Sequence, residues 1–136
     1  DLIRAGDVVS TDVKTIEDML VAGVTPVIYP VDSDKDGNHL NINADTMAAG
    51  IAAGLKCKEM IQVTDVPGIL MDVNDPSSLV SEITLKKVDK LIDDGIISGG
   101  MIPKLENAFN AIDAGVNKVV ITNAQNLGTD SGTECI

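Results

Sequence analysis

The chain has 136 residues, of which 44% are hydrophobic and only 1% aromatic, and its formal net charge is −11. One aliphatic-rich domain of this size can bury a core, which argues against disorder, while the negative charge and the lack of aromatic side chains argue against nucleic-acid binding. No stretch has the length of a membrane span. The chain has two cysteines, Cys57 and Cys135, which are too few for a disulfide scaffold and lack the spacing of a metal site. Such sparse use of cysteine is typical of a cytoplasmic protein.

Helical and extended patterns alternate in the first part of the chain. Apolar spacing predicts a helix over residues 16–24, and the β-rich run 24–31 predicts a buried strand. Asp36-Gly37 is a strong hairpin signal, with residues 39–43 as the returning strand. The Ala-rich stretch 44–55 predicts the next helix.

The second part of the chain continues the alternation. The expected elements are a strand over 60–64, a turn and irregular stretch to residue 76, helices over 84–94 and 103–114, a strand over 118–122 and a last strand over 133–136. This order predicts an α/β domain with parallel strands, crossover helices and one hairpin. Ligands in such sheets bind beyond the carboxyl ends of the strands.

A glycine pair precedes a lysine in the segment Gly99-Gly100-Met101-Ile102-Pro103-Lys104. Glycine lets the backbone approach a ligand closely, and proline is tolerated in the first turn of a helix. A lysine beside the free N–H groups of that turn would suit a phosphate. The usual phosphate-loop and dinucleotide motifs are absent from the chain, so an ordinary loop-to-helix turn is the alternative.

Two acidic or amide-rich segments have simpler interpretations. Residues 32–37 match the first half of a calcium loop, but Asn43 occupies the position that requires a bidentate glutamate, so we interpret them as a hairpin tip. The cluster Asn41-Ile42-Asn43-Ala44-Asp45 either caps a helix or presents Asn41 and Asn43 to a ligand while Asp45 holds a cation.

The segment Asp65-Val66-Pro67-Gly68-Ile69-Leu70 follows a predicted strand. Pro-Gly in the middle of a type II turn explains it, but a loop at the carboxyl end of a strand could also surround a base or a ribose. His39 is expected on the hairpin and receives no catalytic role.

Taken together, these segments resemble the amino acid kinase family, and within it the branch that phosphorylates N-acetyl-L-glutamate. The resemblance rests on NINAD (41–45), TDVPGIL (64–70) and DGIISGGMIPKLENAFNAIDAGV (94–116), with GDVVS (6–10) and GT-x-x-I (132–136). It implies an αβα sandwich with a mostly parallel sheet. It also implies that residues 1–136 form a single domain, the carboxyl-terminal, nucleotide-binding half of a longer kinase.

The resemblance implies a role for each matching residue. Lys104 would stabilise the transferring phosphoryl group, Asp45 would organise Lys104 and a second lysine, and Asn41 would bind the substrate N-acetyl-L-glutamate. The expected nucleotide contacts are Asp65, Val66, Pro67, Gly68, Ile69, Leu70, Ile96, Ile97 and Ser98. The cofactor would be ATP with Mg²⁺, and the whole protein would be a homodimeric enzyme of arginine biosynthesis.

The family's second lysine, glycine-rich phosphate loop and substrate arginine find no match in this chain. Removing one preorganised charge donor commonly lowers a rate by about 10²–10³, so the chain alone is expected to be inactive. The alternatives are another amino acid kinase, of the glutamate 5-kinase or aspartokinase type, or a non-catalytic nucleotide-binding domain.

Overall fold

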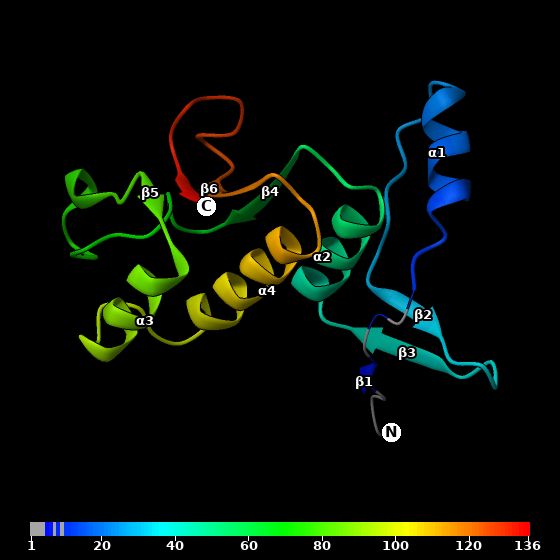
Figure 1. Cartoon of the computed structure of the whole chain (residues 1–136), viewed down its shortest axis with the longest axis horizontal. Helices are drawn as coiled ribbons and strands as arrows, with labels where there is room; N and C mark the ends of the chain where they lie inside the picture. Colours follow the sequence, from blue (N-terminus) through cyan, green and yellow to red (C-terminus); the bar gives the residue numbers. More distant parts are fainter. Residues whose placement is uncertain (1–4, 7, 9) are drawn as a thin grey trace.

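The structure is a computed structural model that describes residues 5, 6, 8 and 10–136 (Figure 1). Residues 7 and 9 of the GDVVS segment lie outside the described residues. The elements, in chain order, are β1 (Ala5–Gly6), α1 (Val13–Val21), β2 (Val31–Ser33), β3 (His39–Ile42), α2 (Ala44–Gly54), β4 (Glu59–Thr64), a 3₁₀ turn (Pro76–Ser78), β5 (Glu82–Ile83), α3 (Leu85–Asp93), α4 (Met101–Asp113), β6 (Lys118–Asn123) and β7 (Thr133–Cys135).

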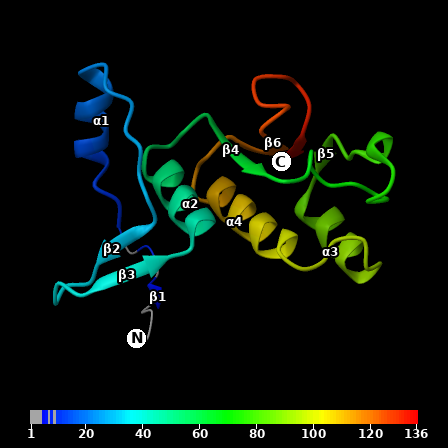
Figure 2. The ribbon, with the colours of Figure 1, turned by 180° about the vertical axis from the view of Figure 1, so that it is seen from behind.

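The strands form two sheets, with orders β1-β3-β2 and β4-β6-β7-β5. The pairs β1–β3, β4–β6 and β5–β7 are parallel, whereas β2–β3 and β6–β7 are antiparallel. Figures 1 and 2 show the smaller sheet and α1 at one end of the molecule, the larger sheet and α3 at the other, and α2 between them. The predicted α/β class with a mostly parallel sheet is therefore confirmed.

The core lies between the larger sheet and helices α2 and α4. Along β4, Met60 and Gln62 are buried, while Ile61 and Val63 on the opposite face are 45% and 49% exposed. On the neighbouring strand β6, Val119 and Ile121 are fully buried. Within the described residues, the helices thus pack on the face of β4 that carries Met60.

The predicted hairpin is present between β2 and β3, with Ser33 opposite His39. Asp34 N–H and Gly37 N–H both donate within the connecting loop, to Asn38 O and Asp34 O respectively. Gly37 has φ of 80°, a conformation that glycine adopts without steric cost. The Asp-Gly pair therefore forms the turn that its sequence indicates.

The prediction of a strand over residues 24–31 is wrong for most of that range. Residues 24–30 form no strand, and β2 begins only at Val31. Val27 and Tyr29 are 94% and 72% exposed, and Pro26 and Pro30 have no N–H group to donate to a sheet. A run of β-branched residues predicted burial, but in this structure the segment passes over the surface.

Two helices begin earlier than expected. Helix α1 begins at Val13 because Asp12 caps it by accepting a hydrogen bond from Thr15 N–H, and it contains no buried residue. Helix α4 begins at Met101, so Pro103 is its third residue and not its first. None of the helices in the described part of the chain could cross a membrane.

Candidate functional site

The lysine-bearing turn leads into a helix whose first N–H groups are weakly bonded. Gly99 has φ of 57°, whereas Gly100 is the N-cap with φ of −66° and makes no side-chain capping bond. The N–H groups of Met101 and Ile102 make only long contacts, 3.4 Å and 3.3 Å, to carbonyl oxygens of the preceding turn. The amino-terminal end of a 13-residue helix with such weakly bonded donors is a suitable place for an anion.

Lys104, in the first turns of α4, forms an ion pair with Asp45, in the first turn of α2. The Lys104 Nζ donates to both carboxylate oxygens, at 2.9 Å and 2.8 Å. The Lys104 side chain is 20% exposed and that of Asp45 is 29% exposed. Two charge-assisted contacts in a partly buried environment hold the ammonium group in place.

The amide cluster before α2 divides into a structural and an exposed part. Asn43 is the N-cap of α2, and its Oδ1 accepts from Thr46 N–H at 3.1 Å and from the Thr46 hydroxyl at 3.3 Å. The capping interpretation therefore holds for Asn43, which fixes the start of the helix that carries Asp45. Asn41 is exposed on β3, and among the described residues it makes no hydrogen bond to Asp45 or Lys104.

Sheet topology brings the loop after β4 to the same edge as these helix ends. In the parallel pair β4–β6, Thr64 lies opposite Asn123 at the carboxyl ends of both strands. Helix α2 leads directly into β4 and α4 leads directly into β6, so the helices run back along the strands and begin near those carboxyl ends. The loop 65–70 leaves β4 from this same edge.

The expected nucleotide contacts differ in exposure. Asp65 and Ser98 are exposed, and Val66, Pro67, Leu70 and Ile96 are half-buried. Ile69 and Ile97 are each 3% exposed and belong to the hydrophobic core. Their side chains stabilise the fold, so only their backbone groups are available to a ligand.

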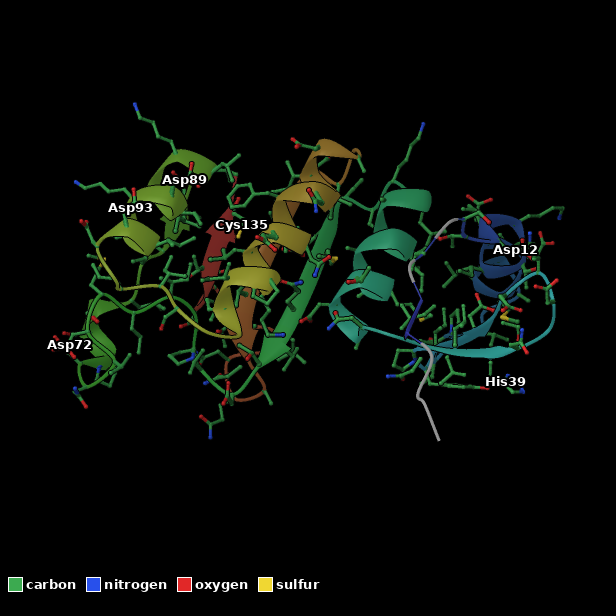
Figure 3. The ribbon with its side chains drawn as sticks, turned by 90° about the horizontal axis from the view of Figure 1, so that it is seen from below. Asp12, His39, Asp72, Asp89, Asp93 and Cys135 are labelled. Carbon is green, nitrogen blue, oxygen red and sulfur yellow. The ribbon has the colours of Figure 1, made fainter. Side chains whose placement is uncertain are left out.

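Other titratable residues that the sequence draws attention to lie elsewhere. His39 is exposed on the hairpin, far from Cys135 on β7 (Figure 3). Burial and the neighbouring Glu134 charge raise the pKa of the Cys135 thiol to about 12, so this thiol stays protonated. Among the described residues, no group of three or more histidine, cysteine, aspartate or glutamate side chains could hold a metal ion.

The structure also contains features that the sequence did not indicate. Gln62 is 4% exposed, and its side-chain amide has no hydrogen-bond partner among the residues that the structure describes. Lys118 contacts Glu59 at 2.9 Å and Glu134 at 3.8 Å, and the hydrogen bond that Lys118 donates to Glu59 is the main cause that raises the Lys118 pKa. Each of these depends on strand pairing, which no local pattern reveals.

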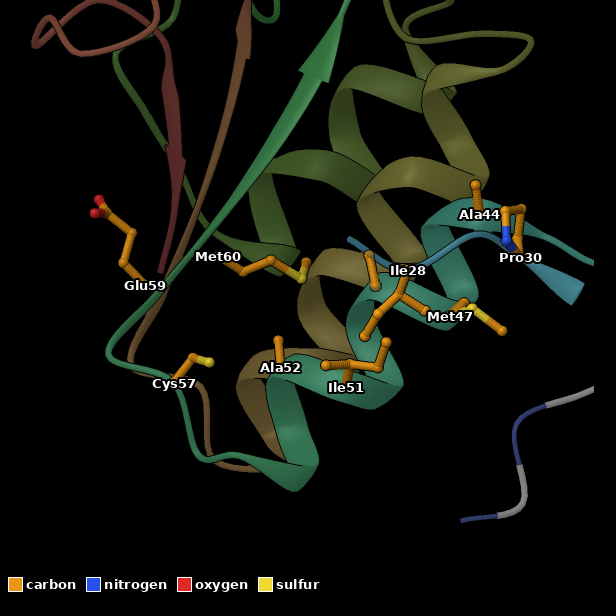
Figure 4. A pocket seen from close by; sticks show the side chains of 10 residues that line it. Ile28, Pro30, Ala44, Met47, Ile51, Ala52, Cys57, Glu59 and Met60 are labelled. Atoms are coloured by element: carbon orange, nitrogen blue, oxygen red, sulfur yellow. The ribbon is translucent and has the colours of Figure 1, made fainter. Parts of the chain in front are cut away.

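An apolar pocket of about 320 Å³ lies beside α2 (Figure 4). Its walls come from α2, from the segment before β2 and from the start of β4, and they include Ile28, Pro30, Met47, Ile51, Cys57 and Met60. Its lining is mostly apolar, so it lacks the charge that a phosphate requires, and we do not assign it to the nucleotide.

Comparisons with known proteins show which family this chain resembles. The sequence profile of the amino acid kinase family matches residues 1–123. Acetylglutamate kinase of Methanopyrus kandleri is 41% identical over 133 residues, which are 98% of this chain and 54% of the relative. Acetylglutamate kinase of Methanosarcina acetivorans is 50% identical over 105 residues, which are 77% of this chain and 35% of the relative.

A solved structure is also similar. The crystal structure of smu.665 from Streptococcus mutans superposes with a TM-score of 0.84 at 35% sequence identity, covering 96% of this chain and 50% of that one. The chain thus spans about half the length of the proteins it matches, or less. On the profile match and the sequence identity, this chain belongs to the amino acid kinase family.

Proposed function

We propose that this chain is the ATP-binding half of an acetylglutamate kinase, and that Lys104 and Asp45 are its catalytic residues. The observation that carries the proposal is the bidentate pair between Lys104 and Asp45 beside the weakly bonded first turn of α4. Relatives named acetylglutamate kinase, at 41% and 50% identity, support the substrate class.

In the proposed reaction, an oxygen of the substrate's side-chain carboxylate attacks the γ-phosphorus of ATP. A new O–P bond forms while the bond from that phosphorus to the bridging oxygen breaks, giving an acyl phosphate and ADP. A carboxylate is already ionised at pH 7, so no general base is required. The protein's task is to position the groups and to stabilise negative charge.

Lys104 would perform the charge stabilisation. Its ammonium group would face the transferring phosphoryl group and the departing ADP oxygen, and the N–H groups of the first turn of α4 would contribute further donors. Asp45 would keep the ammonium group oriented during the reaction. Because both Asp45 oxygens contact Lys104, the lysine needs little rearrangement before it acts.

ATP would enter with Mg²⁺ bound to its phosphates, since the described residues contain no dedicated cluster of metal ligands. The nucleotide would contact the loop 65–70 and Ile96, Ile97 and Ser98. Because Ile69 and Ile97 are buried, their contribution would come from the backbone.

The substrate N-acetyl-L-glutamate would be bound in part by Asn41, which is exposed four residues before Asp45. The whole protein would form a homodimer in the cytoplasm and act in arginine biosynthesis. Because the chain spans about half the length of its relatives, we assign phosphoryl transfer to the whole protein and ATP binding to this part of it.

The experiment is a hydroxylamine-trapping assay, which converts acyl phosphates into coloured hydroxamates. The whole protein, with MgATP, is given N-acetyl-L-glutamate or free L-glutamate in parallel. We expect hydroxamate with N-acetyl-L-glutamate, and turnover faster than with glutamate. Faster turnover of glutamate would reassign the protein to the glutamate 5-kinase type, and ATP binding without any product would indicate a non-catalytic nucleotide-binding domain.

A further inference from the structure

Thr133, on the last strand β7, joins two segments that are distant in the sequence. Its hydroxyl accepts a hydrogen bond from Ile69 N–H at 2.8 Å and donates one to Val80 O at 2.6 Å. Thr133 is fully buried. The hydroxyl therefore satisfies a buried donor in the loop after β4 and a buried acceptor in the segment before β5.

The loop backbone lies closely against this threonine. Gly68 has φ of 146°, and a Cβ at Gly68 would lie 2.6 Å from Thr133 Oγ1 and 3.0 Å from Thr133 N. Ile69 and Val80 are also linked directly, because Val80 N–H donates to Ile69 O at 2.8 Å. Three hydrogen bonds among Ile69, Val80 and Thr133 thus fix the part of the loop formed by residues 68 and 69.

We propose that Thr133 is a positioning residue for nucleotide binding, which holds the loop 65–70 in the conformation that presents Asp65, Val66 and Pro67 to ATP. This inference rests on the proposed function of the loop. The inner residues Gly68 and Ile69 are buried against Thr133, whereas Asp65 is exposed and Val66 and Pro67 are half-buried. Fixing residues 68 and 69 therefore determines where residues 65–67 lie.

Loss of the hydroxyl would leave Ile69 N–H and Val80 O without their partner inside the protein. Such groups regain water when the loop opens, so open conformations become more populated. Because ATP would bind only the closed form, its apparent affinity falls in proportion to the population of that form. The hydroxyl satisfies two buried groups, so its loss should raise the open-to-closed ratio of the loop roughly 500- to 1000-fold. Starting from about one open loop in 100 in the wild type, the open form then predominates, and the Kd should rise roughly five- to tenfold.

The test compares two variants of Thr133 with a control at Thr122. Thr133→Val keeps the shape of the side chain but removes the hydroxyl, and Thr133→Ser retains the hydroxyl. Thr122 is also buried, at 3% exposure, and its hydroxyl donates to Ser131 O at 2.8 Å. Thr122→Val therefore removes a comparable hydroxyl that bonds to a different loop.

Two quantities are measured on the whole protein carrying each substitution: the exchange rate of the Ile69 amide hydrogen by NMR, and the Kd of MgATP by calorimetry. Thr133→Val should speed Ile69 exchange by about tenfold or more and raise the Kd. Thr133→Ser should restore both values, and Thr122→Val should change neither. Unchanged Ile69 exchange in Thr133→Val, or an equal loss of affinity in Thr122→Val, overturns the inference.

The wild-type chain supplies a further test that does not depend on whether a variant folds. Its Ile69 amide should exchange about 100-fold more slowly than the Val66 amide in the same loop, and equal rates would contradict the positioning role. If the wild-type whole protein does not bind MgATP, the proposed function fails and this inference fails with it. If the wild-type protein binds MgATP and its Thr133→Val variant binds equally well, this inference alone fails.

Discussion

Lys104 Nζ lies 2.9 Å and 2.8 Å from the two carboxylate oxygens of Asp45, although the two residues are 59 positions apart in the sequence. The contact joins the first turns of α2 and α4, which pack against each other. It gives the chain one partly buried ion pair at the edge of the sheet where the proposed nucleotide site lies.

The first prediction concerns the contribution of this pair to stability. Asp45→Asn leaves a partly buried ammonium group without its carboxylate, so the free energy of unfolding should fall by about 1–3 kcal/mol. Urea denaturation measures this change. Asp18→Asn is the control, since Asp18 pairs with Lys14 where both side chains are 66% or more exposed. An equal effect of both substitutions on the free energy of unfolding would show that partial burial does not strengthen the Lys104–Asp45 pair.

A second prediction follows from the buried amide of Gln62, which has no hydrogen-bond partner within the described part of the chain. A buried amide without partners destabilises the folded state, and leucine has a similar volume without polar atoms. Gln62→Leu should therefore raise the free energy of unfolding by about 1–2 kcal/mol. Gln125→Leu, at an exposed position, is the matched control and should leave it nearly unchanged. A less stable Gln62→Leu chain would indicate that the amide has a bound partner in solution.

The third prediction concerns Gly68. Gly68→Ala places a methyl group 2.6 Å from Thr133 Oγ1 at φ of 146°, so both a clash and backbone strain should destabilise the chain, by about 3 kcal/mol or more. Gly95→Ala has a positive φ of 72° but nothing within 4 Å of the new methyl group, and should cost only about 1–2 kcal/mol. Thermal unfolding compares the two, and similar losses would refute the close contact with Thr133.

A fourth prediction gives a pH dependence of stability. Burial raises the pKa of Cys135 from 9.0 to about 12 in the folded chain. Between these values the unfolded chain loses the thiol proton while the folded chain keeps it, so rising pH favours unfolding. The wild-type free energy of unfolding should fall by up to ~1.4 kcal/mol per pH unit relative to Cys135→Ala. Parallel pH profiles of the two chains between pH 9 and 12 would contradict a buried thiol.

Sequence reasoning was most successful where a local pattern determines the structure. The Asp36-Gly37 turn, the Asn43 cap and the Ala-rich helix α2 depend on neighbouring residues alone, and all three are present. The strand expected over residues 24–31 is wrong because its apolar composition indicated burial, whereas Val27 and Tyr29 are exposed.

The family resemblance predicted the pairing of Lys104 with Asp45, whereas no local spacing in the sequence indicated it. The partners of Thr133 and Lys118 could not be predicted, because they depend on which strands lie side by side. Gln62 lies within an apolar strand pattern, and only the packing of helices on that face shows that its amide is buried without a partner from residues 5, 6, 8 or 10–136.

The most direct test of the central claim is the affinity of the 136-residue chain for MgATP with and without Lys104. Calorimetry compares the wild-type chain with Lys104→Met and with Lys118→Met, which removes the same charge from the Glu59–Glu134 site. We predict that the wild-type chain binds MgATP, that Lys104→Met weakens binding by about tenfold or more, and that Lys118→Met binds as the wild type does. Equal affinity of the wild-type chain and Lys104→Met would contradict the assignment of Lys104 to the ATP phosphates.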